Sequence, residues 1–374
     1  MNAHRVTHIN SSAGIGGGER HLLLQARYLR GSEFDLDYIL PEEGVFCDEL
    51  EKAGLRYQVV PMRTKFSLRA GARIGAHLRR NRTDLAHLQG ARANWYGRKA
   101  ARNVGVKAIF CTVHNSVWDY PYPAWRRRLY LALERRTTAL VDQWIAVSTG
   151  IRQDLVRYYG IPESKIEVVL NGIDPDEMDV RQDRKQLRRS LGLGPESLVV
   201  LEAARMTGQK GHRYLLDAVA ALKDDLPALR CLFAGDGPTR PELMRQAAAL
   251  GLAGRVHFLG FRSDIPDLLS AADVYVLPSL SEGLPLGLLE AMAMGCPVIA
   301  SAVKGVTDAI EDRVDGFLVP AADVSSLVAA LRQLAASAEL RRCLGEAASR
   351  KVRAHFTAER MARETATLYR RRLE

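Results

Sequence analysis

Two glutamates in the second half of the chain have the spacing and neighbours of a ligand site. Glu282 stands in Ser281-Glu282-Gly283-Leu284-Pro285, and Glu290 follows it after seven residues, inside an apolar run. Because Pro285 suits the first turn of a helix, we expect Glu282 at the helix mouth and Glu290 more than one turn inside. A carboxylate accepts two hydroxyl hydrogen bonds at once, so the pair could bind a sugar and a ribose diol. The alternative is an amphipathic helix with one exposed acid.

Two cations, Arg205 and Lys210, lie in one loop of the same half. The segment Ala204-Arg205-Met206-Thr207-Gly208-Gln209-Lys210-Gly211 directly follows a predicted strand at 198–203. Ligands of parallel sheets bind at the carboxyl ends of strands, so both cations could neutralise a diphosphate and stabilise it as a leaving group. A solvated loop that carries two charges remains the alternative.

Glycine-rich turns follow two other predicted strands. Gly14-Ile15-Gly16-Gly17-Gly18-Glu19 comes after the first strand of the chain, and Gly235-Asp236-Gly237-Pro238 comes after 230–234. Glycine lets the backbone approach a phosphate, and the start of a following helix adds a positive dipole end. The first run is not a dinucleotide fingerprint, because the third glycine of G-x-G-x-x-G would fall on Glu19. Either run could be a plain turn.

One histidine and one pair of aspartates are weaker signals. His114 directly follows a predicted strand at 108–113, where polar residues often belong to a site, although a structural hydrogen-bonding role is also open. Asp35 and Asp37 match a D-x-D metal motif, but they open a strand instead of following one. We therefore expect no metal there.

The elements that position these residues follow from the apolar pattern. Short apolar stretches alternate with helical segments, which is typical of parallel β/α layers. Strands are predicted at 6–10, 36–40, 57–60, 85–88, 108–113, 144–147 and 166–170, and again at 198–203, 230–234, 256–259, 274–277, 298–300 and 317–319. Residues 171–195 lack apolar periodicity and are expected to form the interdomain linker. A chain of 374 residues is longer than a single hydrophobic core usually supports, so two domains are expected. We predict an α/β protein of two doubly wound, Rossmann-like domains that face each other across a cleft, with bounds 1–175 and 176–356.

Together these residues resemble the retaining glycosyltransferases of family four (glycosyl transferases group 1), which have the GT-B fold. In the first half, Gly16-Gly17 with Glu19-Arg20 looks like the family's glycine loop, His114 is similar to its cleft histidine, and Asn171-Gly172-Ile173-Asp174 is similar to its linker motif. In the second half, Arg205 and Lys210 match the phosphate-binding pair, Gly235-Asp236-Gly237-Pro238 the turn, and Glu282 with Glu290 the two signature glutamates. Lys304-Gly305-Val306-Thr307-Asp308 departs from the family pattern, which usually has a glycine pair and a glutamate.

The resemblance implies a nucleoside diphosphate sugar donor, with UDP favoured over GDP, and retaining transfer to a glycan or lipid-linked acceptor in envelope polysaccharide or glycolipid synthesis. Arg205 and Lys210 would hold the diphosphate, Glu290 the ribose and Glu282 the donor sugar. Gly235, Gly283, Leu284 and Pro285 would complete the donor site. Gly16 and Gly17 would let the backbone close on the phosphates, and His114 would line the reaction centre. The resemblance implies neither cofactor nor metal, and a C-terminal helix at 357–374 that crosses back onto the first domain.

The net charge of +10 is concentrated in the first half. Residues 57–141 hold 17 Lys and Arg against three Asp and Glu, and Arg126-Arg127-Arg128 follows Trp125. This basic helix could dock on an anionic membrane, or it could be a solvated face. No nucleic-acid motif accompanies the charge. Five scattered cysteines and no apolar leader favour a cytoplasmic enzyme, with docking on the inner face of the cell membrane left open. The rival functions are a nucleotide-sugar epimerase of the same fold and a non-catalytic scaffold.

Overall fold

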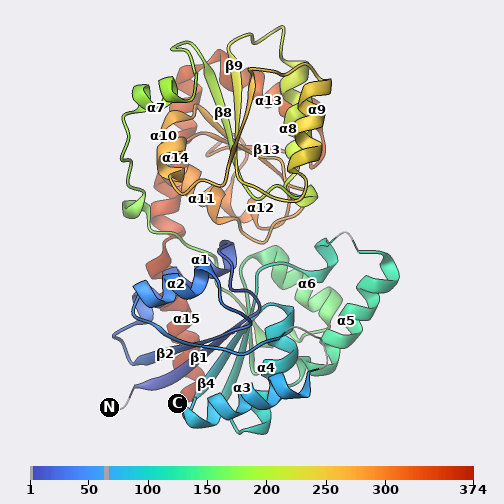
Figure 1. The fold of residues 1–374 in the computed structure, drawn as a ribbon, viewed down its shortest axis with the longest axis vertical. Helices are drawn as coiled ribbons and strands as arrows, with labels where there is room; N and C mark the ends of the chain where they lie inside the picture. Colours follow the sequence, from blue (N-terminus) through green and yellow to red (C-terminus); the bar gives the residue numbers. More distant parts are fainter. Residues whose placement is uncertain (1–2, 63–66, 121) are drawn as a thin grey trace. The chain divides into compact units, whose positions relative to one another are not determined.

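The computed structural model describes residues 3–62, 67–120 and 122–374, and it divides the chain into two compact units (Figure 1). Unit 1 comprises Met1–Gly172 together with Ala358–Glu374, and unit 2 comprises Ile173–Thr357. The boundaries expected after residues 175 and 356 lie within a few residues of these. Within the described residues, no helix combines the length and the apolar character needed to cross a membrane.

Unit 1 is built on a parallel sheet whose strand order, among the described residues, is β3-β2-β1-β4-β5-β6-β7. The strands are β1 (His4–Asn10), β2 (Phe34–Leu40), β3 (Arg56–Val59), β4 (Leu85–Gln89), β5 (Ala108–Val113), β6 (Gln143–Ala146) and β7 (Ile166–Val168). Strand β1 pairs with β2 on one side and with β4 on the other, so the order reverses between β1 and β4. Doubly wound sheets bind ligands at such a switch point, outside the carboxyl ends of the strands.

The helices of unit 1 come from both ends of the chain. They are α1 (Gly17–Leu29), α2 (Val45–Lys52), α3 (Leu68–Arg80), α4 (Ala91–Asn103), α5 (Ala124–Thr138), α6 (Thr149–Tyr159) and α15 (Ala358–Leu373). Helix α15 packs against α1, and its residues Met361, Ala362 and Tyr369 belong to the unit 1 core (Figure 1). The predicted return of the C-terminal helix to the first domain is therefore confirmed.

Unit 2 repeats the design with the strand order β10-β9-β8-β11-β12-β13 among the described residues. The strands are β8 (Leu198–Ala203), β9 (Leu229–Ala234), β10 (Val256–Gly260), β11 (Val274–Leu277), β12 (Val298–Ser301) and β13 (Phe317–Val319). Strand β8 pairs with β9 and with β11, which puts the switch point of this sheet between β8 and β11. All strand segments predicted from the sequence are present, with ends shifted by one or two residues.

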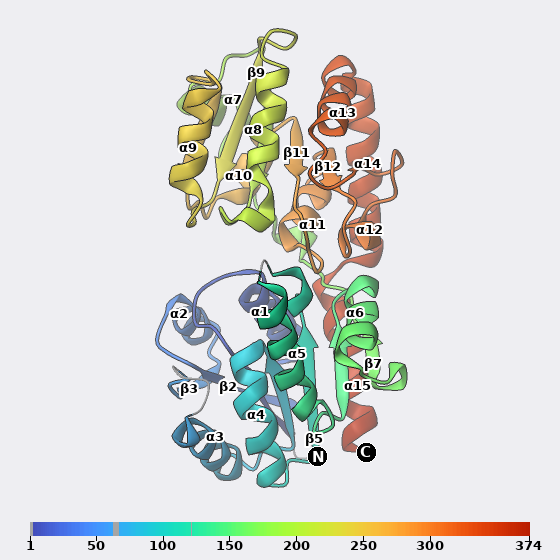
Figure 2. The same cartoon turned by 90° about the vertical axis from the view of Figure 1, so that its right-hand side faces the viewer.

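Helices cover both faces of the unit 2 sheet (Figure 2). They are α7 (Arg184–Ser190), α8 (His212–Ala221), α9 (Arg240–Ala249), α10 (Ile265–Ala271), α11 (Leu286–Ala293), α12 (Val306–Ala309), α13 (Val324–Ala336) and α14 (Ala338–His355). Helix α8 packs against α9 and α13 on one face, whereas α11 packs against α14 and α7 against α10. The predicted fold class, two Rossmann-like α/β domains, is confirmed.

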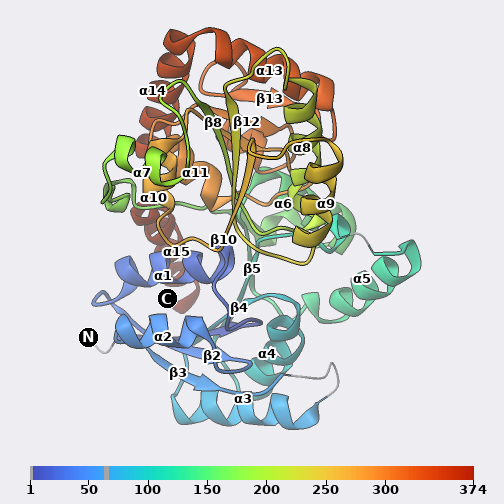
Figure 3. The same cartoon turned by 45° about the horizontal axis from the view of Figure 1, so that its top comes forward.

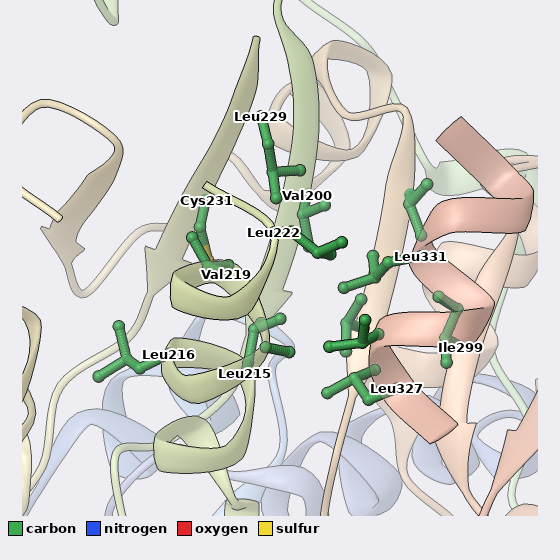
Figure 4. Packing of buried hydrophobic residues seen from close by; sticks show 14 of the residues in the cluster. Val200, Leu215, Leu216, Val219, Leu222, Leu229, Cys231, Ile299, Leu327 and Leu331 are labelled. Atoms are coloured by element: carbon green, nitrogen blue, oxygen red, sulfur yellow. The ribbon is translucent and has the colours of Figure 1, made fainter. Parts of the chain in front are cut away.

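The core of unit 2 holds α8 in a fixed place, which matters because the loop with Arg205 and Lys210 leads directly into this helix. Leu215, Leu216, Val219 and Leu222 recur at helical spacing and are fully buried. Figure 4 shows Val219 and Leu222 beside the strand residues Cys231 and Val200, and Leu215 on the side of the helix that faces Leu327 of α13. Truncating one such leucine typically costs about 2–5 kcal/mol, so the start of α8 is firmly anchored.

The segment 171–195, predicted as the interdomain linker, contains the boundary between the units at 172–173 but also a helix. Helix α7 lies in this segment, with Asp183 as its side-chain N-cap and Leu187 buried. Arg184 and Arg188 reach Asp273, at N–O distances of 2.6 and 3.4 Å. Because α7 is held by one apolar residue and several ion pairs, its sequence shows no apolar period, and the helix could not be recognised from hydrophobic spacing.

Candidate functional site

The cation loop, residues 204–211, leaves the carboxyl end of β8 at the switch point of the unit 2 sheet. Arg205 stands near its start with an exposed side chain, and Lys210 ends the short 3-10 helix η4 (Gly208–Lys210). The predicted position of both cations, directly after a strand and before a helix, agrees with the structure. Two cationic side chains therefore lie where an anionic ligand of this fold would bind.

Lys210 and Glu282 form a direct ion pair. Lys210 Nζ lies 2.6 Å from Glu282 Oε1, and the Ser279 hydroxyl lies 2.6 Å from the same oxygen. Glu282 is only 4% exposed, and Ser279 is fully buried. These contacts join the loop after β8 to the loop after β11, on the two sides of the switch point. A carboxylate held this way keeps its second oxygen, Oε2, for a hydroxyl ligand.

Glycines fix the backbone of the cation loop at close range. A Cβ on Gly235 would lie 2.0 Å from the Ala204 carbonyl oxygen, and one on Gly237 would lie 2.2 Å from that of Met206. Gly211, with φ of +77°, approaches the Pro278 carbonyl equally closely, with 1.9 Å for a Cβ. Only glycine allows these backbones to touch, so the turn after β9 and the loop after β11 both support the cation loop.

The second signature glutamate, Glu290, lies in α11 and is 2% exposed. Helix α11 begins at Leu286, with Pro285 as its N-cap and Leu284 buried. The helix therefore does not extend over Glu282, which lies in the preceding loop. The Gly283 carbonyl is in tight contact with Gly305, where a Cβ would lie 1.6 Å from that oxygen. The segment that departs from the family pattern, 304–308, thus supports the Glu282 turn.

In unit 1, the glycine loop follows β1 at the other switch point. Gly16 is the N-cap of α1, with extended backbone, and Gly17 is the first helical residue. Space around Gly17 is open, because a Cβ added there would meet no atom within 4 Å. Glu19, 9% exposed, accepts a hydrogen bond of 3.0 Å from Asn10 Nδ2. The exposed N-terminus of α1 offers backbone N–H groups that suit a phosphate.

His114 follows β5 and lies beside the glycine loop of the same unit. Its Nε2 is 2.8 Å from Gln89 Oε1, and its ring packs edge-on against that of His21, with centroids 4.8 Å apart. Burial, and then the nearby His21, hold the pKa of His114 well below 6.5. The imidazole is therefore neutral near pH 7, and one of its nitrogens can accept a proton or a hydrogen bond.

His114 borders a cluster of buried histidines that the sequence did not reveal. His8 in β1, His21 in α1 and His87 in β4 are at most 1% exposed. Burial, reinforced by the neighbouring His21, lowers the pKa of His8 to about 3, and burial lowers that of His21 to about 4. His21 Nδ1 also lies 3.0 Å from Asn171 Oδ1, so the asparagine of the linker motif orients this ring.

The contacts described above bring some of the predicted residues together within each unit. In unit 2, the loops after β8, β9 and β11 bring Lys210, Glu282 and Gly235 together. In unit 1, Gly16, Gly17 and His114 gather after β1 and β5. Sequence reasoning missed Ser279, His21, Glu202 and His212. A signal existed for Glu202, since it is an acid within the otherwise apolar strand Leu198–Ala203.

The D-x-D aspartates of β2 have protein partners. Asp35 pairs with Arg56 at 2.7 Å, and Asp37 accepts from Asn81 Nδ2 at 3.0 Å and contacts His77. Both carboxylates therefore have side-chain partners within unit 1, although they lie in the strand and not in the loop after it. They belong to a side-chain network between β2, β3 and α3.

Comparison with known proteins covers both units. Residues 15–177 match the model of Glycosyltransferase Family 4, and residues 183–351 match that of Glycosyl transferases group 1. The UDP-Gal:alpha-D-GlcNAc-diphosphoundecaprenol alpha-1,3-galactosyltransferase of Escherichia coli is 27% identical, with 87% of each chain covered. The Bacillus subtilis protein EpsD, named a glycosyltransferase, is 30% identical, with 72% of this chain and 71% of EpsD covered. Anabaena HepE, solved with UDP and glucose, superposes with a TM-score of 0.87 at 23% identity, over 98% and 99% of the two chains.

Proposed function

Because this chain belongs to the family 4 glycosyltransferases and has their GT-B fold, we propose that it transfers a sugar from a nucleoside diphosphate donor, with retention, to a glycan or lipid-linked acceptor. The observation that carries the proposal is the Lys210–Glu282 pair at the switch point of unit 2, with Arg205 in the same loop as Lys210 and the buried Glu290 in the helix after Glu282. This set combines fixed cations for a diphosphate with acceptors for sugar hydroxyls.

Each residue of unit 2 has a role that follows from its chemistry. Arg205 and Lys210 bind the diphosphate, and their charge stabilises it as it leaves the sugar. Glu290 accepts hydrogen bonds from the ribose hydroxyls, and Glu282 from the hydroxyls of the donor sugar. Gly235, Gly283, Leu284 and Pro285 shape the backbone around these groups. Donor binding draws Lys210 from Glu282 toward the phosphates, which frees Glu282 Oε1 for the sugar.

The unit 1 residues complete the reaction. Gly16 and Gly17 expose the N-terminus of α1 to the phosphates, and the neutral His114 lines the reaction centre. The departing phosphate takes the proton of the acceptor hydroxyl as the new glycosidic bond forms, so no protein nucleophile is needed. The fixed cations and the helix N-terminus carry out the electrostatic work of a metal, so activity should survive chelation.

We favour UDP as the nucleotide. HepE has been solved with UDP, and the name of the Escherichia coli relative specifies UDP-Gal and a diphosphoundecaprenol acceptor. A GDP-sugar is the second candidate. For the acceptor, the lipid diphosphate in that name supports a lipid-linked glycan.

We also propose that the enzyme acts in the cytoplasm, docked on the anionic inner face of the cell membrane through α5. This helix extends from the rest of unit 1 (Figure 3), and only Leu131 and Thr137 of its residues are buried. Trp125 is 68% exposed and Leu129 is 48% exposed, one helical turn apart. Such an apolar stripe on an exposed helix suits the interface of a bilayer.

The charge around this stripe is positive. Arg126, Arg128, Arg135 and Arg136 are exposed, whereas the one acid of the helix, Glu134, is paired with the buried Arg98 at 2.8 Å. Arg127 stacks over the Trp118 ring at 4.2 Å, which stiffens the base of the helix. Each surface arginine near an anionic leaflet contributes about 1 kcal/mol, so this cluster is enough for reversible docking.

A thermal-shift screen tests the donor proposal. The protein is heated with UDP, GDP, ADP and their common sugar conjugates, with EDTA present, beside the Lys210→Ala and Glu290→Ala variants. A ligand at 100 times its Kd adds about 2.7 kcal/mol of stability, which is easily detected. We expect UDP to stabilise the wild type and both variants to lose the effect. If no nucleotide does so, with or without metal, the donor site is wrong and a scaffold role is favoured.

Product analysis tests the reaction. NMR of the product should show the anomeric configuration of the donor, and an inverted linkage would refute retention. Conversion of the donor sugar without any acceptor would instead identify an epimerase.

Vesicle pelleting tests the membrane proposal. Vesicles that contain anionic lipid should recruit the wild type at moderate salt, and Trp125→Ala with Leu129→Ala should weaken recruitment at least about fivefold. Phe261→Ala is the matched control, because Phe261 is 71% exposed in unit 2. Equal recruitment of the double variant, or no recruitment of the wild type, would refute docking through α5.

A further inference from the structure

Glu202 and His212 stand at the two ends of the cation loop and are both buried. Glu202 lies near the end of β8 with no exposed surface, and His212 is the first residue of α8 and 1% exposed. Glu202 Oε1 is 3.3 Å from His212 Nδ1. This contact links the strand that enters the cation loop to the helix that leaves it.

Burial disfavours the charged form of both side chains, and so raises the pKa of Glu202 and lowers that of His212. Burial, and then the negative charge of Glu282, raise the pKa of Glu202 well above 4.5, although Lys210 opposes this shift. Burial, and then the positive charge of Lys210, lower the pKa of His212 to about 4. Among the described residues, neither Glu202 oxygen and neither His212 ring nitrogen has a hydrogen-bond partner of good geometry, so the 3.3 Å approach of Oε1 to Nδ1 is the polar contact that joins the two side chains. Burial thus favours a protonated carboxyl beside an unprotonated imidazole, and at 3.3 Å the carboxyl O–H could donate to Nδ1 after a small adjustment of either side chain.

The surroundings explain why the neutral form matters. The titratable groups that face Glu202 are His212 in α8, Lys210 in η4, Glu282 after β11, Cys231 in β9 and Tyr275 in β11. An ionised Glu202 would attract Lys210 and repel Glu282, in competition with their 2.6 Å ion pair. A neutral Glu202 leaves the charge of Lys210 available to Glu282 and to a ligand.

We propose that Glu202 and His212 are positioning residues which share one proton as a neutral pair, close the base of the cation loop, and so hold Lys210 and Arg205 for a diphosphate. Neither side chain needs to touch the substrate. The proposal rests on the donor role of unit 2 only where nucleotide binding is used to test it. It is separate from the roles of Glu282 and Glu290, because it concerns the fixed geometry of the loop itself.

Hydrogen exchange on the ligand-free full chain provides the first test. Glu202→Leu should raise the exchange of the amides at 204–212 by about tenfold or more, because loss of the pair lets the loop open. Glu202→Gln should leave it near the wild-type value, because its amide N–H can donate to His212 Nδ1 in place of the carboxyl. Val200→Ala, on the same strand and also buried, is the control for general loss of stability.

Calorimetry with UDP and with uridine provides the second test. Glu202→Leu should raise the Kd of UDP by about tenfold and that of uridine by less than about twofold. The reason is that, under the proposed function, only the phosphates contact the cation loop. As the pH rises, Glu202 of the wild type ionises and UDP affinity should fall. Glu202→Gln cannot ionise, so this part of the pH profile should be flat.

The outcomes separate the two proposals. If the wild type binds neither UDP nor GDP, the donor proposal fails, and hydrogen exchange still decides the positioning role. Unchanged exchange at 204–212 in Glu202→Leu would overturn the positioning role even if UDP binds. A Glu202→Gln variant as impaired as Glu202→Leu at pH 7 would overturn the neutral pair.

Discussion

The two sheets reverse their strand order at equivalent switch points, but the side chains at the carboxyl ends of their strands differ in charge. At the unit 2 edge, the loops carry the Lys210–Glu282 ion pair and the exposed Arg205. At the unit 1 edge, four neutral histidines and a glycine loop take the corresponding places. Under the proposed function this difference is a division of work, in which unit 2 binds the anionic donor and unit 1 supplies backbone N–H groups and an uncharged ring.

Removal of Lys210 should have the largest effect on this comparison. Lys210→Ala loses a cation that stabilises the leaving diphosphate, so we expect kcat/KM to fall about 10³-fold. Initial rates of sugar release from the UDP-sugar donor measure it. Because the substitution also leaves the buried Glu282 unpaired, Lys210→Ala with Glu282→Gln should regain stability without regaining activity. Lys223→Ala, which removes an exposed lysine of the same unit, should change neither.

The glycine that supports the cation loop should come next. Gly235→Ala places a Cβ against the Ala204 carbonyl, at 2.0 Å before relaxation, so the loop must move. We expect UDP to bind about 10–100-fold more weakly by calorimetry, since a displacement of about 1 Å is enough for such a loss. Unchanged affinity would show that the cation loop does not hold the phosphates.

The histidine cluster predicts that acid weakens unit 1 more than unit 2. In the folded protein His8 and His21 stay neutral down to pKa values of about 3 and 4, whereas in the unfolded chain they bind protons near pH 6.5. The unfolded state therefore binds more protons below that pH, and stability falls as the pH drops from about 6.5 through about 4. At pH 5, each of these histidines should lower the free energy of unfolding by on the order of 2 kcal/mol.

The tryptophans make this measurable, because all four lie in unit 1. Tryptophan fluorescence during urea unfolding reports the free energy of unfolding of unit 1, and hydrogen exchange of the α8 amides reports that of unit 2. Between pH 7 and pH 5, the value for unit 1 should fall more steeply. His212 and the partly exposed His257 are the histidines of unit 2 with a lowered pKa. Equal losses in the two probes would contradict the proposed difference.

The smallest effect on stability is expected at Gly17. No atom lies within 4 Å of a Cβ at this position, so Gly17→Ala should change the Tm by no more than about 1 °C. Donor turnover should nevertheless fall about tenfold if the α1 N-terminus closes on the phosphates. Full turnover in this variant would remove Gly17 from the site and leave the donor to unit 2.

The strands and the main charged residues could be predicted because their signals are local. An apolar run bounded by turns marks a strand wherever it lies, and Arg205, Lys210 and Glu282 directly follow such runs. Helix α7 was missed because ion pairs with Asp273 replace an apolar face. His8, His21 and Glu202 were missed because one polar residue within a buried element carries no sign of its neighbours.

By itself, the sequence determined two Rossmann-like sheets, the loops that end their strands, and the cations and carboxylates in those loops. Hydrophobic periodicity and turn-forming residues are local signals that extend over a few residues. They can therefore be recognised in the sequence without knowledge of the tertiary structure. The tertiary structure decided which of these residues meet: Lys210 with Glu282, Gly235 with Ala204, His21 with His114, and Glu202 with His212. Packing alone removes water from the Glu202 carboxyl, and this burial raises its pKa.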